Sequence, residues 1–392
     1  ATASHRLLAE RAVAPLGLFD EILATEGEVN LKGAAKRDLL VVRFGARGFD
    51  YVGDSHADLP VWQACATAHV VSDSPALIET VRATGRLGRV FATGRAPWGL
   101  SFLRALRPHQ WAKNLLLLAP LFAAHRYGDP GSLVNALLAM LVFSLVASSV
   151  YLLNDLVDLP SDRRHARKRH RPIAAGDLSL LHGWLAWPLL LASGLGLSFA
   201  ALPGPFSATA LIYVLLTLAY SLRLKRWPIV DVLALATLYT LRIVAGSMAI
   251  GVPLSFWMLS FSMFFFLSLA LLKRHSELLA ARQTGQGEAL HGRGYAPQDL
   301  ELVASLGGAA GYLAVLVLAL FIQDAQTAAH YGRPQLIWLA CPLLLYWISR
   351  VWLLGHRGRM HEDPVVFALR DRVSWVVLAL FGTVFLLARL WV

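Results

Sequence analysis

The sequence predicts an all-α polytopic membrane protein with about nine transmembrane helices, preceded by a partial α/β domain. Hydrophobic residues make up 56% of the 392 residues and charged residues only 16%. A soluble chain of this composition, with a mean hydropathy of +0.54, would have too few polar side chains to cover its surface. Apolar segments of membrane-spanning length recur from about residue 110 to the C-terminus.

The N-terminal region, residues 1–92, has a mixed composition. Short β-like runs (LLVVRF, FDYVGD and AHVVSD) lie between Ala-rich stretches of helical character, which is typical of an α/β domain. Residues 93–108 form a linker, and residues 109–392 form the membrane domain. Because the chain opens on Ala1 and not on Met, we expect a further N-terminal portion upstream.

Nine apolar segments are candidate spans. They cover residues 111–126, 131–153, 179–201, 206–222, 228–250, 253–272, 301–322, 335–354 and 373–391. Arg and Lys concentrate in alternate loops, at 154–178, 223–227, 273–300 and 355–372. Since basic loops stay on the cytoplasmic side, we expect a multi-pass protein of the cell (inner) membrane whose N-terminal region and charged loops are cytoplasmic.

The same rule explains the formal net charge of +11 without a nucleic-acid partner. The two cysteines, Cys65 and Cys341, lie far apart in unlike contexts, so neither a disulfide framework nor a zinc site follows. The sequence does not determine an oligomeric state.

An acidic motif, NDLVDLPSD, follows the second span. Asp155, Asp158 and Asp162 are spaced i, i+3, i+7, which places them on one face if the segment is a helix. Three carboxylates repel each other unless a cation lies between them, and Mg²⁺ binds carboxylates together with substrate phosphates. Asn154 adds an amide oxygen. The alternative is a solvated acidic loop that pairs with the arginines beside it.

Six Arg/Lys and two His residues follow within nine positions, 163–171. Most of these cations are interpreted as membrane-topology anchors. Lys168 and Arg171 lie near Pro172 and the next helix, and we expect them to contact phosphate oxygens of a Mg²⁺-bound diphosphate.

A second block, YSLRLKRWPIVDV, joins two later spans. It contains Tyr220, Ser221, Lys225 and Asp231. Asp231 begins an apolar helix, where a lone charge is costly without a partner. Arg242 lies eleven residues further along the same helical face, which favours a ligand contact over an anchor.

Two further basic stretches flank other spans. Arg107, Lys113 and Asn114 in RPHQWAKN are candidate phosphate contacts, with an ordinary juxtamembrane anchor as the alternative. Lys273 and Arg274 in LLKRHSE end the sixth span, and the alternative for Lys273 is a helix-surface ion pair with Glu277. Tyr295 in GRGY is a weaker candidate.

These motifs resemble the UbiA-type prenyltransferase family over roughly residues 101–392. The first block matches its NDxxDxxxD motif, and YSxxLKxxxxxD occupies the place of its second motif. That family carries a further acid four positions on, where this chain has Leu235. The wording RPHQWAKN, NDxxDxxxDRxHxxKxxRPIAAG, YSLRLK and LLKRHSE is similar to the decaprenyl-phosphate phosphoribosyltransferase branch.

The resemblance implies Mg²⁺-dependent transfer of 5-phosphoribose from phosphoribosyl pyrophosphate to a polyprenyl phosphate, giving a lipid-linked cell-wall precursor and pyrophosphate. The residues that it implies as catalytic are Asp155, Asp158, Lys225 and Asp231, with Asp162 as a further metal ligand. The alternative within the family is prenyl transfer from a prenyl diphosphate to a small acceptor, which Leu235 disfavours. A transporter is disfavoured because the acids lie at span ends, not at the bilayer midplane.

Residues 1–92 resemble the haloacid-dehalogenase-like phosphohydrolases. Thr2 matches their second motif, Lys32 the third, and Asp54 and Asp58 in GDSHAD the fourth. The resemblance implies that Thr2 and Lys32 hold a phosphate and that the two acids help to bind Mg²⁺. The DxD motif with the nucleophile is expected upstream of Ala1. If that motif is present, such a domain is expected to remove the 5-phosphate of the lipid-linked product; the alternative is a remnant with a structural role.

Overall fold

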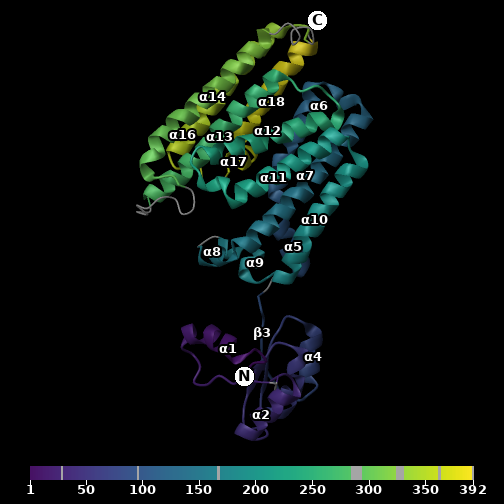
Figure 1. Cartoon of the computed structure of the whole chain (residues 1–392), viewed down its shortest axis with the longest axis vertical. Coiled ribbons are helices and arrows are strands. Elements are labelled where there is room, and N and C mark those ends of the chain that lie inside the picture. Colours follow the sequence, from purple (N-terminus) through teal and green to yellow (C-terminus); the bar gives the residue numbers. More distant parts are fainter. Residues whose placement is uncertain are drawn as a thin grey trace. The chain divides into compact units, whose positions relative to one another are not determined.

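The computed structural model describes residues 1–27, 30–94, 97–165, 168–283, 294–323, 331–360 and 363–390. The chain divides into two compact units, Ala1–Ala96 (unit 1) and Pro97–Val392 (unit 2), and each is described by itself (Figure 1).

Unit 1 is built around a three-stranded parallel sheet in the order β1-β2-β3. The strands are β1 (Tyr51–Gly53), β2 (Ala68–Val71) and β3 (Leu87–Phe91). The helices of unit 1 are α1 (Arg6–Val13), η1 (Ala14–Leu16), α2 (Ala34–Phe44), η2 (His56–Asp58), α3 (Leu59–Ala64) and α4 (Pro75–Arg82). Burial alternates along β2, and its inward side chains pack on Trp62, Leu77 and Val81.

One expected strand of unit 1 is wrong. The run LLVVRF, residues 39–44, forms the second half of helix α2. Lys36 and Leu40 are the buried residues of this helix, and their spacing of four places them on one helical face. The helical period beginning at Ala34 therefore overrides the β-propensity of the two valines.

Unit 2 is helical, and its described residues form eight helices that are long and apolar enough to cross a membrane. They are α7 (Pro130–Val157), α10 (Leu180–Ala201), α11 (Gly204–Leu222), α12 (Val230–Ile250), α13 (Phe256–Gln283), α14 (Leu300–Gln323, preceded by η7, Pro297–Asp299), α16 (Ala340–His356, preceded by η8, Pro334–Leu339) and α18 (Arg372–Leu390). Their positions agree with eight of the nine expected spans.

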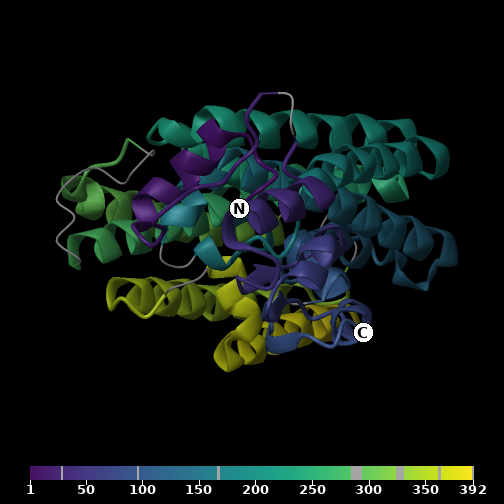
Figure 2. The same ribbon diagram turned by 90° about the horizontal axis from the view of Figure 1, so that it is seen from below.

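Burial separates the central helices from the peripheral ones. The most apolar stretches of α7 and α12 are each 61% buried inside the protein, whereas those of α10 and α18 are 11% and 17% buried. Apolar residues that protein does not cover can face lipid, so α10 and α18 are lipid-facing and α7 and α12 form the centre. Figure 2 shows the C-terminal helices, in yellow, along one side of the unit.

The expected span at 111–126 is not one continuous helix. The chain runs through α5 (Trp98–Leu106), the 3₁₀ helix η3 (Pro108–Leu118) and the short α6 (Ala119–Ala123). Proline has no backbone N–H and disfavours helical backbone in the residue before it, so Pro108 and Pro120 interrupt the helix. Residues 107–123 are called the broken segment below.

Short elements complete unit 2. They are η4 (Arg126–Gly128), α8 (Leu159–Arg164), η5 (Lys168–His170), α9 (Pro172–Ala175), η6 (Leu224–Arg226) and α17 (Pro364–Arg370). The broken segment packs closely against α12. A Cβ added at Gly246 would lie 2.2 Å from the carbonyl oxygen of Leu117, so only glycine permits this approach. This contact fixes the part of the broken segment that carries Lys113 and Asn114.

Candidate functional site

A cavity of about 300 Å³ opens between α7, α11, α12, α13, α17 and the broken segment. Its lining includes seven of the site residues expected from the sequence, together with Leu235: Arg107, Lys113, Asn154, Tyr220, Ser221, Arg242 and Lys273. It also includes Tyr151, Tyr213, Tyr239 and Asp363, which the sequence did not point to. Segments more than 200 residues apart in the chain, from Arg107 to Asp363, therefore share one cavity.

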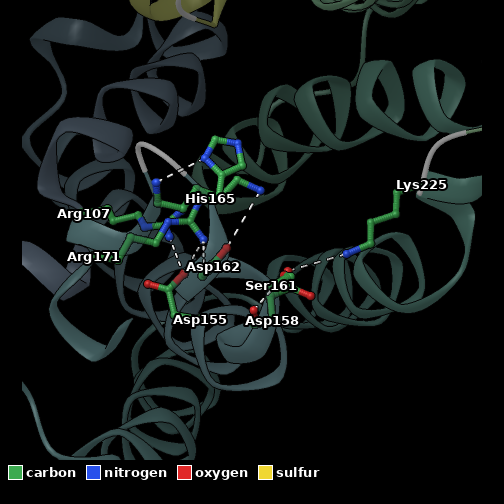
Figure 3. Close-up of polar contacts among 9 residues, drawn as sticks. Arg107, Asp155, Asp158, Ser161, Asp162, His165, Arg171 and Lys225 are labelled. Carbon is green, nitrogen blue, oxygen red and sulfur yellow. Dashed lines mark hydrogen bonds and ion pairs between the residues drawn. The ribbon is translucent and has the colours of Figure 1, made fainter. Parts of the chain in front are cut away.

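The three acids of the first motif do not share one helical face. Helix α7 ends at Val157, Asp158 lies in the turn, and Asp162 belongs to α8. Pro160 ends the helix because it has no N–H to continue the hydrogen bonding. Asp155 and Asp162 are consequently buried on one side of the turn, whereas Asp158 points away from them (Figure 3).

Two arginines hold the buried pair of acids. Arg171 Nη1 lies 3.0 Å from Asp155 Oδ1 and 2.5 Å from Asp162 Oδ2. Arg107, which ends α5 in the left-handed conformation, also pairs with Asp155. Lys168 Nζ lies 3.9 Å from Asp162 Oδ1. Arg107, Lys168 and Arg171 therefore stand beside the acids, where they could also contact the phosphates of a substrate.

The second block approaches the first through Lys225. Its Nζ lies 3.8 Å from Asp158 Oδ2, and Figure 3 shows the two side chains pointing toward one another. Tyr220 and Ser221, at the end of α11, line the same cavity as Asn154 at the end of α7. The structure thus brings the two blocks together from helices α7 and α11.

Asp231 does not line this cavity. Its side chain is fully buried, with Arg274 Nη2 2.8 Å from Oδ2 as an ion pair without good hydrogen-bond angles. The hydroxyl of Tyr295 donates to Asp231 Oδ1 at 2.6 Å and accepts from the N–H of Ile229 at 2.8 Å. Burial, followed by the hydrogen bond to Asp231, raises the pKa of Tyr295 above its usual range. Asp231, Arg274 and Tyr295 thus form one internal network at the start of α12.

A second cluster of charges lies in the cavity and centres on Asp363, which precedes α17. Lys113 Nζ and Lys273 Nζ lie 2.8 Å and 3.2 Å from Asp363 Oδ2, and the Tyr239 hydroxyl donates to the same carboxylate. Lys273 was alternatively expected to pair with Glu277. In the structure Lys273 pairs with Asp363, and Glu277 pairs with Arg274. No pattern in the sequence marks Asp363, except that it is an acid that precedes a proline.

Arg242 lies beside this cluster and is buried among neutral groups. It donates to Asn114 Oδ1 at 3.1 Å, to the Leu238 carbonyl at 2.7 Å and to the Tyr213 hydroxyl at 2.7 Å. Asn114 is oriented for this by its own bond to Ser144. The predicted candidates Lys113, Asn114 and Arg242 therefore meet, although they come from segments over 120 residues apart.

Unit 1 carries a separate polar site at the carboxyl end of β1. Asp58 is buried and accepts hydrogen bonds from Lys36 Nζ at 2.8 Å and from the Tyr51 hydroxyl at 2.9 Å. Burial alone would raise the pKa of Asp58 and lower that of Lys36. Their mutual hydrogen bond outweighs burial, so the pKa of Asp58 is lowered and the pKa of Lys36 is raised. Lys36, near the start of α2, therefore forms this contact in place of the expected Lys32, which lies in the loop before that helix.

The other candidates of unit 1 are more exposed. Lys32 and Asp54 are exposed, and Asp54 directly follows β1. The Thr2 N–H donates to the carbonyl of Leu23, and the neighbouring Ala1 is close enough to Lys36 and Asp58 to feel their charges. Thr2 and the Lys36–Asp58 pair thus lie in the same part of unit 1.

The acidic motif offers oxygen atoms to a cation, although no group of three or more His, Cys, Asp or Glu side chains in the described ranges converges as a metal site. Asp155 Oδ2 and Asp162 Oδ1 are buried and accept no hydrogen bond from any described residue. Buried carboxylate oxygens without donors are costly. Their chemistry, with the amide oxygen of Asn154 nearby, fits a hard divalent cation such as Mg²⁺.

Comparisons with known proteins identify relatives of this chain. Residues 115–370 match the UbiA prenyltransferase family. An uncharacterized protein of Sinorhizobium fredii is 39% identical over 388 residues, which cover 99% of this chain and 75% of that protein. The decaprenyl-phosphate phosphoribosyltransferase of Mycobacterium tuberculosis is 33% identical over 290 residues, which cover 72% of this chain and 92% of that enzyme.

A similar fold occurs in a solved structure. The UbiA homolog from Archaeoglobus fulgidus, bound to DMAPP and Mg²⁺, superposes with a TM-score of 0.56 at 20% sequence identity. The match covers 73% of this chain and 99% of that structure.

Proposed function

This chain belongs to the UbiA prenyltransferase family and is a membrane-embedded, multi-pass transferase, and from that premise we propose that it transfers 5-phosphoribose from phosphoribosyl pyrophosphate to a polyprenyl phosphate. The products are a lipid-linked 5-phosphoribose and pyrophosphate. The proposed setting is the cell (inner) membrane, with the charged loops on the cytoplasmic side, where the water-soluble donor is available.

The observation that carries the proposal is the lining of the cavity. The two blocks meet at its edge, where Lys225 approaches Asp158, but Leu235 presents an apolar side chain at the position of the family's additional acid. Relatives at 33% identity are named decaprenyl-phosphate phosphoribosyltransferases. Leu235 and these relatives support the sugar-phosphate donor over a prenyl diphosphate.

In the proposed reaction, the pyrophosphate end of the donor lies at Asp155, Asp158 and Asp162. Mg²⁺ bound there would neutralise the departing pyrophosphate. Arg107, Lys168 and Arg171 stand beside these acids and would hold the phosphate oxygens that the metal leaves free. Lys225, beside Asp158, would contribute positive charge from the opposite block.

The bond changes need no strong base. The bond between C1 of the ribose and the pyrophosphate oxygen breaks, and the pyrophosphate leaves with the electron pair. An oxygen of the lipid phosphate, which is already anionic, forms the new bond to C1. The contribution of the protein is therefore positioning and charge stabilisation. Asp231 would support this site indirectly, by fixing the start of α12 through Arg274 and Tyr295.

Transfer of label tests the proposal directly. The purified full chain is incubated with phosphoribosyl pyrophosphate labelled in the ribose, Mg²⁺ and decaprenyl phosphate, and the lipid phase is then counted. The proposal expects label in the lipid phase that depends on Mg²⁺ and on both substrates. If the label stays in the water phase while a prenyl diphosphate is consumed in a parallel reaction with an aromatic acceptor, prenyl transfer is the activity.

For unit 1, the proposal is removal of the 5-phosphate from the lipid-linked product. It is supported by the buried Lys36–Asp58 pair beside the carboxyl end of a parallel strand, with Asp54 exposed next to it. Lys36 takes the phosphate-holding role that the sequence suggested for Lys32. Release of inorganic phosphate from isolated lipid-linked phosphoribose tests this step, and it should be lost in Lys36→Met while transfer of label continues. No release by the full natural protein would contradict it.

A further inference from the structure

Positive charge exceeds negative charge among the residues that line the cavity. The described lining contains four cations, Arg107, Lys113, Arg242 and Lys273, and one acid, Asp363. Arg107 pairs with Asp155, which is not part of the lining. Among the acids of the described lining, Asp363 alone is therefore available to the other three cations. The residues Lys113, Arg242, Lys273 and Asp363 are called the Asp363 cluster below.

Asp363 is shared between two ammonium groups. Lys113 and Lys273 both approach the same oxygen, Oδ2, while Tyr239 donates a hydrogen bond to the carboxylate from α12. Although burial alone would raise the pKa of Asp363, the charges of Lys273 and Lys113 hold this pKa well below its usual range. The carboxylate is therefore ionised, and it holds Lys113 and Lys273 in place at the cavity wall.

Arg242 has no carboxylate partner among the described residues. Its hydrogen bonds go to an amide oxygen, a backbone carbonyl and a hydroxyl, all of them neutral, and it lies 4.9 Å and 5.4 Å from the ring centroids of Tyr213 and Tyr239. It is only 5% exposed. A buried charge is costly unless an opposite charge accompanies it, so Arg242 at the cavity wall favours a bound anion.

We propose that the Asp363 cluster is a subsite for a phosphate monoester, separate from the acidic motif that takes the pyrophosphate. This deepens the proposed function and rests on it. Two substrates of that reaction carry such a group: the donor has a 5-phosphate, and the acceptor lipid ends in a phosphate. A prenyl diphosphate carries its two phosphates in one diphosphate group and has no separate phosphate monoester, so a cationic second subsite matches the phosphoribosyl reaction.

The cluster suits a dianion for a geometric reason. Lys113 comes from the broken segment, Arg242 from α12 and Lys273 from α13, so the three cations approach the cavity from three elements. A phosphate has enough acceptor oxygens to meet a guanidinium and an ammonium group together. Asp363 acts as a positioning residue, because it holds Lys113 and Lys273 without itself being suited to contact an anion.

The first test needs no enzymatic activity. Inorganic phosphate should raise the thermal unfolding temperature of the purified wild-type chain, and it should raise that of Lys113→Met and Arg242→Met much less. Arg350→Met, which breaks the ion pair of Arg350 with Asp371 away from the cavity, is the matched control and should keep the full response. An equal response in all four proteins, or no response in the wild type, would overturn the subsite.

The second test identifies the source of the phosphate. In Lys113→Met, the KM of whichever substrate the subsite holds should rise about 10- to 100-fold, as expected for loss of a charge-assisted hydrogen bond. A rise for phosphoribosyl pyrophosphate identifies the donor 5-phosphate, and a rise for polyprenyl phosphate identifies the lipid head group. Unchanged KM values for both substrates would contradict the proposal.

Two further variants separate binding from folding. Lys113→Arg keeps the charge and should recover most of the lost affinity, whereas a purely structural role for the amine would not predict this recovery. Asp363→Asn should raise the KM of the same substrate and reduce the rise in unfolding temperature caused by phosphate. The reason is that Lys113 and Lys273 both lose the carboxylate that holds them. If the wild type binds phosphate but transfers no label, the proposed function fails while the subsite remains supported, so the two failures are distinguishable.

Discussion

Arg274 and Asp231 form an ion pair in which both side chains are 0% exposed, with Nη2 of the arginine 2.8 Å from Oδ2 of the aspartate. Tyr295, which lies just before η7 and α14, closes the same network. The pair joins α12 to α13 at a point outside the cavity lining. An acid of the second block is thus placed in the protein interior, where its partner is another side chain.

This pair makes a prediction about stability. Removing one partner of a buried pair leaves an uncompensated charge, which typically costs about 3–5 kcal/mol. We expect Arg274→Met to lower the thermal unfolding temperature strongly in detergent solution, more than Arg350→Met at a partly exposed pair. Asp231→Asn should also lower it. If Asp231→Asn instead keeps full stability and loses kcat alone, Asp231 has a direct catalytic role.

The acidic motif predicts a different outcome for Asp155 and Asp158. Asp155→Asn and Asp158→Asn should each lower transfer of label at least about 100-fold, as for other losses of transition-state charge stabilisation. Chelation of divalent cations should have the same effect and be reversed by added Mg²⁺. The control is Asp129→Asn, since Asp129 caps α7 at its other end and asparagine caps equally well. Transfer that survives chelation would argue against a metal at this motif.

The ion pair between Lys225 and Asp158 is expected to affect activity but not stability. Their ion pair is 3.8 Å long and both side chains are partly exposed, at 26% and 37%. Exposed pairs contribute only about 0–1 kcal/mol. Lys225→Met should therefore leave the unfolding temperature nearly unchanged while it lowers kcat/KM for the donor. A parallel loss of stability would show that Lys225 serves mainly to hold the two loops together.

In unit 1, the Lys36–Asp58 pair predicts a dependence of stability on pH. The pKa of Asp58 is lowered in the folded chain, so its contribution is present above the unfolded pKa of about 3.9 and is lost as pH falls through the folded value. The pKa of Lys36 is raised, so its contribution is present below about 10.4 and is lost as pH rises through the folded value. We expect the stability of unit 1 to fall at the acid and the alkaline limit. The fluorescence of the buried Trp62 measures this unfolding.

The matched variants for this measurement are Asp58→Asn and Asp54→Asn. Only the first removes a buried charge, because Asp54 is exposed. The acid limit should disappear, with lower stability at neutral pH, in Asp58→Asn and should persist in Asp54→Asn. Identical pH profiles in the two variants would show that another carboxylate sets the limit.

The close contact between Gly246 and Leu117 allows a test of how the packing of the broken segment on α12 affects stability and binding. An alanine Cβ there would meet backbone atoms of Leu117 at 2.2–3.0 Å, and backbone cannot move aside as a flexible side chain can. We expect Gly246→Ala to cost about 1–3 kcal/mol and to raise the KM of the substrate that contacts Lys113. Gly308→Ala, at a helical position with open space around the new Cβ, is the control and should behave as wild type.

Much of the fold follows from the sequence because membrane spans are long and apolar on every side. Eight of the nine expected spans are long helices. The ninth failed because Pro108 and Pro120 interrupt an otherwise apolar run, and because Lys113 and Asn114 turn toward the interior. Polarity and hydrogen bonding to other helices, which one sequence does not show, decide whether such a run stays helical.

The site was predictable where it lies within a motif and not where it depends on distant contacts. The acids at 155–162 and the block at 220–231 were identifiable from spacing, but their common helical face was lost at Pro160. Asp363 meets Lys113 across 250 positions of sequence, and no local pattern marks that partnership. Lys36 was missed in favour of Lys32 because the motif match selects a lysine in the loop before α2, whereas the contact with Asp58 comes from a buried lysine inside that helix.

The broken segment has a consequence for hydration. A 3₁₀ stretch with left-handed Arg107 at its start forms backbone hydrogen bonds of poorer geometry than those of a continuous α-helix. At membrane depth such backbone is tolerated only where protein or a water-filled hollow surrounds it. The interior beside Lys113 and Asn114 is therefore not a dry hydrocarbon environment. In the proposed reaction, an ionic sugar phosphate would approach this interior from the aqueous side, while the isoprenoid tail of the acceptor would stay in the surrounding lipid.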